Sequence, residues 1–138
     1  MSKRLGTAMV LFSALMLLTS GMAVGATYPV IKGKWNVSIN CVTWDESTDQ
    51  FSTGAYIGTL NISYQDPKTG NFYGRFESYP LTGNVSTDGT LTAILRGAYD
   101  CDFTIFTCKV TGNKKILGTW NHYKGDHIDT CKVRIIKQ

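Results

Sequence analysis

The sequence contains little that would form a helix, a membrane span or a nucleic-acid-binding surface. Beyond residue 26, no window places apolar residues at i, i+3, i+4 and i+7 without an interrupting glycine, so no amphipathic helix is expected. No apolar run in that region is long enough to cross a bilayer as a helix. Lys and Arg are scattered along the chain, which argues against a nucleic-acid-binding protein. These absences leave an all-β domain as the expected fold class.

The N-terminus has the pattern of a cleavable secretory signal. Lys3 and Arg4 precede an almost entirely apolar run at 10–18, and small residues follow it. We predict cleavage after Ala26, with Ala23 as the second choice. The apolar run is too short and too interrupted to favour a transmembrane segment. The protein is therefore expected to be secreted or periplasmic.

The predicted mature chain, residues 27–138, has the length of one small domain. It holds 12 basic and 10 acidic residues, so it is nearly neutral. Turn sequences divide it, and the clearest is the Asp88-Gly89 pair, which is typical of a tight β-hairpin. Short runs rich in β-branched and aromatic residues lie between the turns. We predict eight strands at about 34–42, 55–65, 71–79, 81–86, 90–97, 103–111, 115–123 and 130–137.

Apolar and polar residues alternate along these runs, as in an antiparallel sheet with one buried face. In the first run Trp35, Val37 and Ile39 alternate with polar residues such as Asn36 and Ser38. Eight such strands are predicted to close into an up-and-down β-barrel, and a two-sheet β-sandwich is the alternative. A membrane barrel needs the opposite arrangement, with apolar residues outside, so the domain is not expected to be membrane-embedded.

Three Asn-x-Ser sequences support this assignment of faces. Asn36, Asn61 and Asn84 all fall on the predicted outer face. Glycosylation at these sites depends on the host, and alternating Asn and Ser on a polar face also produce such sequences by chance.

All four cysteines lie in the predicted mature domain, and an even count in an exported chain favours two disulfides. In an even-stranded barrel the first and last strands are antiparallel neighbours. Cys41 ends the first and Cys131 begins the last, so we predict a Cys41–Cys131 bridge at one rim. The remaining pair is then Cys101–Cys108, which would close a small loop.

Gly33-Lys34-Trp35 opens the first strand and resembles the Gly-x-Trp start of lipocalins and avidins, the calycin group. The resemblance implies that Trp35 plugs or lines one end of the barrel. The chain is shorter than a typical lipocalin and lacks the C-terminal helix, and the biotin-binding loop residues of avidins have no counterpart. Biotin binding is therefore not implied. Size, export and disulfides are also similar to those of eight-stranded periplasmic protease inhibitors, which is an analogy of fold alone.

Residues suited to catalysis or metal binding are few. The His122 and His127 pair, with Asp126 and Asp129 nearby, has metal-ligand chemistry, but we interpret these residues as exposed turn residues. Asp100 and Asp102 are interpreted as solvated loop charges rather than an acid–base pair. The acidic loop of Asp45, Glu46 and Asp49 lacks the regular ligand spacing of a calcium site. We predict no catalytic residue, no metal site and no cofactor.

The inward aromatic residues are the best candidates for a binding site. Ligand pockets are concave and apolar with few polar groups, and small barrels can hold one small molecule. The alternative is that these side chains simply fill the barrel. One hypothesis is therefore a barrel that binds a small apolar or aromatic ligand. The candidate residues are Trp35, Tyr56, Tyr64, Phe72, Phe76 and Trp120.

The second hypothesis is a non-enzymatic interaction protein, either an inhibitor of an extracellular enzyme or a component of a surface assembly. It rests on residues 27–31, an extended segment that could pair with a partner's sheet.

Overall fold

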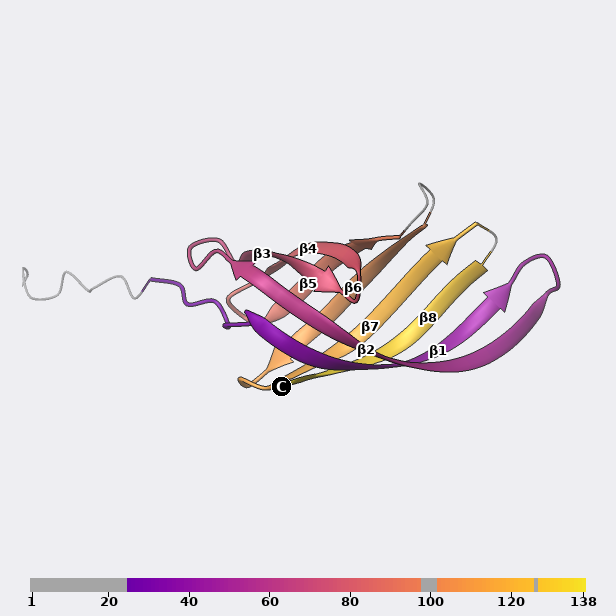
Figure 1. Ribbon diagram of the computed structural model, residues 1–138, viewed down its shortest axis with the longest axis horizontal. Coiled ribbons are helices and arrows are strands. Elements are labelled where there is room, and N and C mark those ends of the chain that lie inside the picture. Colours follow the sequence, from indigo (N-terminus) through magenta and orange to yellow (C-terminus); the bar gives the residue numbers. More distant parts are fainter. Residues whose placement is uncertain (1–24, 98–101, 126) are drawn as a thin grey trace, which may run out of the picture.

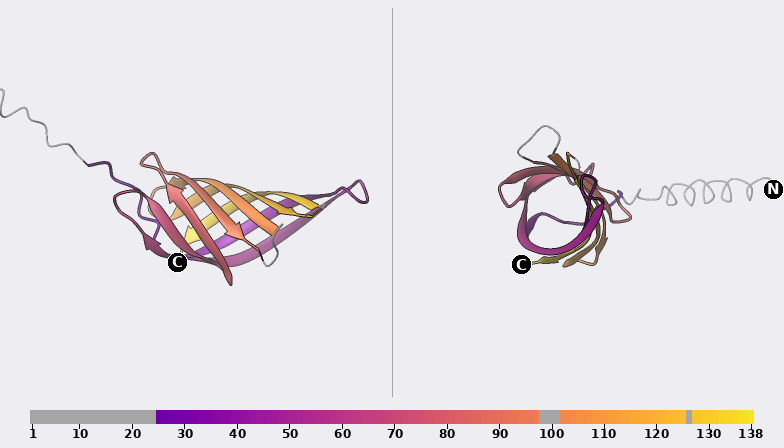
Figure 2. Two further views of the ribbon diagram at one scale, coloured as in Figure 1. Left: turned by 90° about the horizontal axis from the view of Figure 1, so that it is seen from above. Right: turned by 90° about the vertical axis from the view of Figure 1, so that its right-hand side faces the viewer.

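Eight antiparallel strands close into a single barrel (Figures 1 and 2). The computed structural model describes residues 25–97, 102–125 and 127–138. Consecutive strands pair in chain order and β8 pairs with β1, which confirms the up-and-down barrel and excludes the sandwich. No helix able to span a membrane occurs within these residues. The strands are β1 (Gly33–Asp45), β2 (Gln50–Gln65), β3 (Asn71–Phe76), β4 (Tyr79–Val85), β5 (Thr90–Arg96), β6 (Asp102–Thr111), β7 (Lys115–Lys124) and β8 (His127–Lys137).

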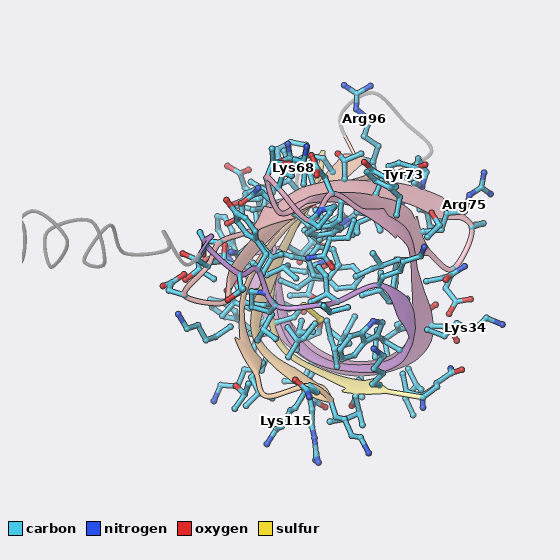
Figure 3. The ribbon with its side chains drawn as sticks, turned by 90° about the vertical axis from the view of Figure 1, so that its left-hand side faces the viewer. Lys34, Lys68, Tyr73, Arg75, Arg96 and Lys115 are labelled. Atoms are coloured by element: carbon cyan, nitrogen blue, oxygen red, sulfur yellow. A yellow bond between two sulfur atoms is a disulfide. The ribbon has the colours of Figure 1, made fainter. Side chains whose placement is uncertain are left out.

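The inner and outer faces follow the predicted alternation. Trp35, Val37 and Ile39 of β1 are buried, whereas the residues between them are exposed. Viewed along the barrel, charged side chains such as Lys34 and Lys115 point away from the ring of strands (Figure 3). The three Asn-x-Ser asparagines, Asn36, Asn61 and Asn84, are exposed as predicted.

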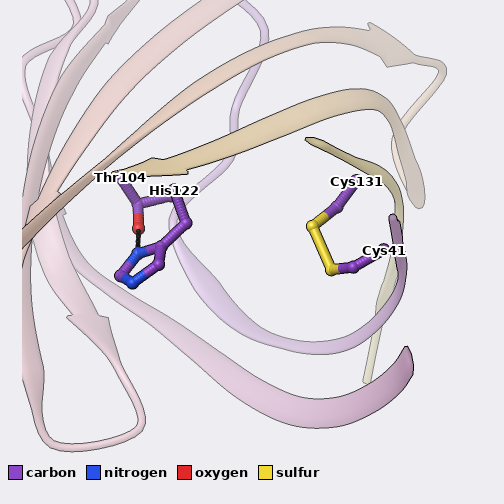
Figure 4. Close-up of a disulfide and its surroundings, with 4 residues drawn as sticks. All are labelled: Cys41, Thr104, His122 and Cys131. Carbon is purple, nitrogen blue, oxygen red and sulfur yellow. Dashed lines mark hydrogen bonds between the residues drawn. A yellow bond between two sulfur atoms is a disulfide. The ribbon is translucent and has the colours of Figure 1, made fainter. Parts of the chain in front are cut away.

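The barrel closes between β1 and β8, and a disulfide joins the two strands. Cys41 lies directly opposite Cys131 in the register, and the two sulfur atoms are bonded at 2.08 Å. Both cysteines belong to the inward-facing set, so the bridge lies inside the wall (Figure 4). The predicted Cys41–Cys131 bridge is thus confirmed, and it is compatible with an oxidising extracellular or periplasmic environment.

The predicted Cys101–Cys108 bridge is wrong. Cys108 is a free, buried thiol in the middle of β6. Six extended residues separate it from Asp102 at the start of that strand, which is about 20 Å at strand spacing, whereas bridged Cα atoms lie within about 7 Å of each other. Cys101 itself lies outside the described residues. The sequence argument failed because it paired the two cysteines by elimination, although the predicted strand at 103–111 already placed Cys108 well inside a strand.

The residues before β1 close one end of the barrel. Ile31 is fully buried, and its carbonyl accepts a 2.8 Å hydrogen bond from the Trp35 indole Nε1–H. The Gln65 side chain accepts from the Ile31 amide at 2.8 Å and donates to the Pro29 carbonyl at 2.7 Å. Lys137 Nζ lies 5.4 Å from the centre of the Trp35 ring. Trp35 therefore plugs this end, as the resemblance to calycins implied, and residues 27–31 are not a free arm.

The opposite end is open and uneven. β1 and β2 continue past the predicted strand ends to Asp45 and back from Gln50, so their hairpin projects beyond the rest of the barrel (Figures 1 and 2). β3 and β4 stop much earlier, at Phe76 and Tyr79. One wall of the open end is consequently long and the wall next to it is short.

Removing the disulfide should destabilise the fold substantially. The bridge spans 90 residues, and in the chain-entropy model a loop of this length contributes about 4–5 kcal/mol to the free energy of unfolding. We expect the Cys41→Ala/Cys131→Ala variant to lose most of that amount in urea unfolding. The free energy of unfolding of the wild-type protein, measured in the presence of a reductant, should match that of the variant. A variant as stable as oxidised wild type would contradict a role of this bridge in stability.

Gln65 is expected to hold the N-terminal segment in place. Gln65→Ala removes two hydrogen bonds to the segment, and leaving buried partners unsatisfied costs about 1–3 kcal/mol. Hydrogen exchange should show that the Ile31 amide loses protection while strand amides keep theirs. Gln50→Ala, at an exposed position of β2, is the control. Unchanged protection at Ile31 would show that the segment is held by packing alone.

Candidate functional site

A cup of about 370 Å³ occupies the open end of the barrel. Its walls come from β2, the β3–β4 hairpin, the end of β5, the start of β6 and the end of β7. The core residues beneath it fill the closed half, so the interior is packed at one end and hollow at the other. The lining residues are Tyr56, Phe76, Tyr79, Leu95, Gly97, Asp102, Thr104, Trp120, His122 and Lys124.

Aromatic rings form one side of the cup. Trp120 packs edge-on against Phe76 with ring centres 5.0 Å apart, and against Phe106 at 4.7 Å. Tyr56 extends the cluster through Phe76 at 5.9 Å. Phe76 and Phe106 are buried, whereas Tyr56 is 48% exposed. The rings therefore run from the core to the mouth and offer an apolar surface that a flat molecule can contact.

A buried polar chain faces these rings. Thr104 is fully buried, and its Oγ1 lies 2.8 Å from His122 Nδ1 (Figure 4). On the other side of the imidazole, His122 Nε2 lies 3.2 Å from Asp102 Oδ1. A carboxylate facing Nε2 favours the tautomer that carries its proton there, so that Thr104 donates its hydroxyl proton to Nδ1.

Two carboxylate oxygens of this end are buried without a hydrogen-bond partner. Among the described residues, neither Asp102 Oδ1 nor Asp129 Oδ1 accepts a hydrogen bond. The contact between His122 and Asp102 is close enough for an ion pair but is not aligned as a hydrogen bond. Asp129 lies opposite His122 in the β7–β8 register, but of the two carboxylates only that of Asp102 lines the cup. A buried acceptor without a donor is costly, and a bound molecule carrying a donor would satisfy it.

The predicted site residues separate into three groups. Tyr56, Phe76 and Trp120 line the cup, and their contact with a ligand stays a prediction. Trp35 and Phe72 are buried in the packed part of the core, away from the cup.

Tyr64 was predicted to face inward, and this prediction is wrong. The β2–β3 register shifts between Ile62 and Tyr64, where β2 carries one extra residue. This bulge reverses the alternation, so Tyr64 lies outside and stacks on the exposed Tyr73 at 5.0 Å. Nothing in the local sequence pattern distinguishes the bulge from regular strand.

The interpretation of His122 and His127 as turn residues is also wrong. Both belong to strands, and His122 shares the inward face of β7 with Trp120, two residues earlier. That spacing was the signal that could have placed His122 in the cup. Asp102, interpreted as a loop charge, is the first residue of β6 and lines the cup as well. Asp100 and Asp126 lie outside the described residues.

The described residues contain no group of three or more His, Cys, Asp or Glu side chains suited to a metal ion. In the acidic loop, Asp45 Oδ1 instead accepts hydrogen bonds from the Ser47 amide and hydroxyl. The Ser47 hydroxyl is the main reason why the pKa of Asp45 is lowered. This carboxylate therefore stabilises the turn between β1 and β2.

No protein-family model matches the chain, and no curated protein matches it. The eight-stranded closed barrel is consistent with a small calycin-like barrel in architecture. Function therefore has to be argued from the cup itself.

Burial should make Cys108 slow to react. Desolvation raises the pKa of its thiol to about 11, against 9.0 when solvated, so thiolate at neutral pH falls by about 100-fold. Peptide mapping after iodoacetamide treatment should find Cys108 unmodified in the folded protein and modified after unfolding. The thiol of Cys108 loses its proton at a lower pH in the unfolded chain than in the folded protein. The raised pKa therefore also predicts that the free energy of unfolding falls as the pH rises from about 9 to about 11. Labelling equally fast in both states would contradict this account.

Proposed function

We propose that the protein is a binding barrel for a small, largely aromatic or apolar molecule that carries a hydrogen-bond donor. The observation that carries the proposal is a hollow cup that combines an aromatic wall with the unsatisfied oxygen of Asp102. A volume of about 370 Å³ is at the lower end for ligand pockets, which suits a molecule of one or two rings.

The two parts of the cup have different roles in this proposal. The rings of Trp120, Phe76 and Tyr56 supply most of the affinity by burying apolar surface of the ligand. Asp102 orients the ligand by accepting from its N–H or O–H groups. A cationic amine fits this arrangement especially well, because it is attracted both to carboxylates and to aromatic faces.

The geometry favours binding over catalysis. Thr104, His122 and Asp102 form a hydroxyl–imidazole–carboxylate sequence that superficially resembles a nucleophile with its base. Thr104 is fully buried, however, so its hydroxyl is not accessible for attack on a substrate. We therefore propose that these side chains position His122 and Asp102 in the wall of the cup, and that the protein is not an enzyme.

Compartment and family belong to the same proposal. Residues 1–24 lie outside the described residues, and the Lys3-Arg4 start supports export to the periplasm or the cell exterior. The closed barrel, together with Trp35 at its plugged end, supports a calycin-like role in which one open end receives the ligand. An interaction protein remains the second candidate, but residues 27–31 no longer support it because they are bound to the chain's own barrel.

Ligand binding should quench the fluorescence of Trp120. We expect native mass spectrometry of protein purified from its own host to show a co-purified small molecule, and titration with aromatic amines to quench tryptophan emission. Asp102→Asn should weaken binding of an amine by about tenfold or more, since hydrogen bonds to charged groups contribute about 1.5–3 kcal/mol. Trp120→Phe should abolish the quenching while retaining most of the affinity.

Tyr64→Ala is the matched control, because this tyrosine lies outside the barrel and should leave affinity unchanged. Two results would contradict the proposal. One is the absence of any bound mass and any quenching across the panel. The other is binding that Asp102→Asn and Tyr64→Ala affect equally.

A further inference from the structure

Half of β2 has an unpaired edge. β2 pairs with β1 from Gln50 to Ile62, but its pairing with β3 is confined to Leu60–Gln65. Glu77 ends that pairing: its amide donates to the Thr59 carbonyl and its carboxylate accepts from the Thr59 amide. Among the described residues, 50–58 therefore have a strand neighbour on one side only. The projecting hairpin that carries this edge is seen in Figure 1.

This edge lacks the features that protect exposed strand edges. Proteins usually place charges, prolines or bulges on such edges to prevent strand addition. Residues 50–58 contain no charged residue and no proline, and their pairing with β1 shows no register shift. Ile57 at 82% and Phe51 at 74% are the two most exposed large apolar side chains of the described chain. Their exposure is unexplained in an isolated barrel.

We propose that a second copy of this chain covers the edge, with the two β2 strands antiparallel about a two-fold axis at Gly54. Residue numbers of paired positions then add to 108, so Phe51 meets the partner's Ile57 and Thr53 meets the partner's Ala55. The most exposed apolar pair becomes a cross-strand pair on each side of the axis. Because no charge lies within 50–58, no like charges oppose each other. The proposal is independent of ligand binding.

The backbone geometry supports this register. N–H and C=O groups of successive strand residues point alternately to the two edges. Thr59 directs its groups toward Glu77 on the β3 side, so Phe51, Thr53, Ala55 and Ile57 direct theirs to the unpaired edge. The β1–β8 pairing gives the same assignment of backbone directions. The Cα atoms of Cys41 and Cys131 are 4.0 Å apart, which is typical of an opposed pair that exchanges no backbone hydrogen bonds. Cys41 therefore directs its N–H and C=O toward Gly54 of β2, and Gly54 directs its own groups toward β1.

An axis at Gly54 pairs these four edge residues with one another. Each hydrogen-bonded pair exchanges two bonds, so four such pairs give about eight bonds between the copies. A register displaced by a single residue would oppose groups that point away from each other. Only alternate registers are therefore possible, and of these the one at Gly54 joins Phe51 to the partner's Ile57.

The outer surface also continues across the axis. Phe51 is opposite Trp44, Trp44 is opposite Ile128, and Ile128 is opposite Tyr123, so an apolar row runs around the rim and ends at the edge. The partner's Ile57 extends this row. On the inner face, the partner's Ser52 lies beside Tyr56, at the mouth of the cup.

The first test measures oligomeric state by sedimentation equilibrium over a wide concentration range. Wild type should form dimers. Ala55→Pro removes an edge N–H that β1 does not use, and should raise the dimer dissociation constant by about tenfold or more. Ile57→Lys should do the same. Val30→Lys, at another highly exposed apolar position, should dimerise like wild type. Circular dichroism of each variant checks that the barrel is folded.

The second test examines the register. Phe51→Glu alone and Ile57→Lys alone should each be monomeric. A mixture of the two should form heterodimers, because the introduced glutamate and lysine then meet across the axis. Heterodimer formation by this mixture requires that positions 51 and 57 pair across the axis, and nonspecific hydrophobic association would not produce it.

Wild type that stays monomeric at every concentration would overturn the proposal, and would leave the edge to a strand of another protein. Dimers that Ala55→Pro and Ile57→Lys do not weaken would also overturn it, since the interface would then lie elsewhere. Failure of the mixed charge variants to associate, while wild type dimerises, would reject the Gly54 register. None of these results depends on whether the cup binds a ligand.

Discussion

The pairing of β1 with β8 is the constraint on which the rest of the structure depends. These strands are first and last in the barrel, and their contact gives each of them its second neighbour, so that every strand has two neighbours in the packed half. Such a long-range contact costs loop-closure entropy, and the Cys41–Cys131 bridge removes much of that cost from the unfolded chain. Because both sulfur atoms lie on the inner face, closure also fixes which side chains of β1 and β8 enter the core.

The two ends of the closed barrel differ in whether a segment of the chain covers them. At one end the chain folds back over the opening, where Ile31 is buried and Gln65 satisfies its amide. No comparable segment covers the other end within the described residues, and the side chains there become polar. His122, Asp102 and Asp129 are placed at an apolar boundary with partly unsatisfied hydrogen-bonding groups. Proteins tolerate such a cost mainly where a site is functional, which is why the cup rather than the core carries the proposed function.

The features that could be predicted from the sequence are those that depend on regular alternation of apolar and polar residues and on strand order. Eight strands, their faces and the Cys41–Cys131 pair all follow from a period of two and the neighbourhood of the first and last strands. It failed where one residue breaks that period, as at the bulge that turns Tyr64 outward. It failed again at His122, which was interpreted as a turn residue although it shares the parity of the inward-facing Trp120. It also failed at Cys108, which was paired with Cys101 by elimination although it lies well inside a strand. The hollow of the cup was not predictable, because volume depends on where each wall ends.

The unequal lengths of the strands link the cup to the unpaired edge. β2 has 16 residues and β3 has 6, so β2 continues past its neighbour on the β3 side. This mismatch lowers one wall, which opens the cup between Tyr56 and Tyr79, and it also leaves the edge-facing backbone groups of residues 50–58 without a strand partner. Lengthening β3 and β4 would pair the edge but would narrow the mouth of the cup. The proposed second copy would resolve this conflict, because it would pair the edge from outside the barrel and leave the opening in place. An uncharged edge beside an open cup is therefore what the proposed binding and the proposed dimerisation would together require of this barrel.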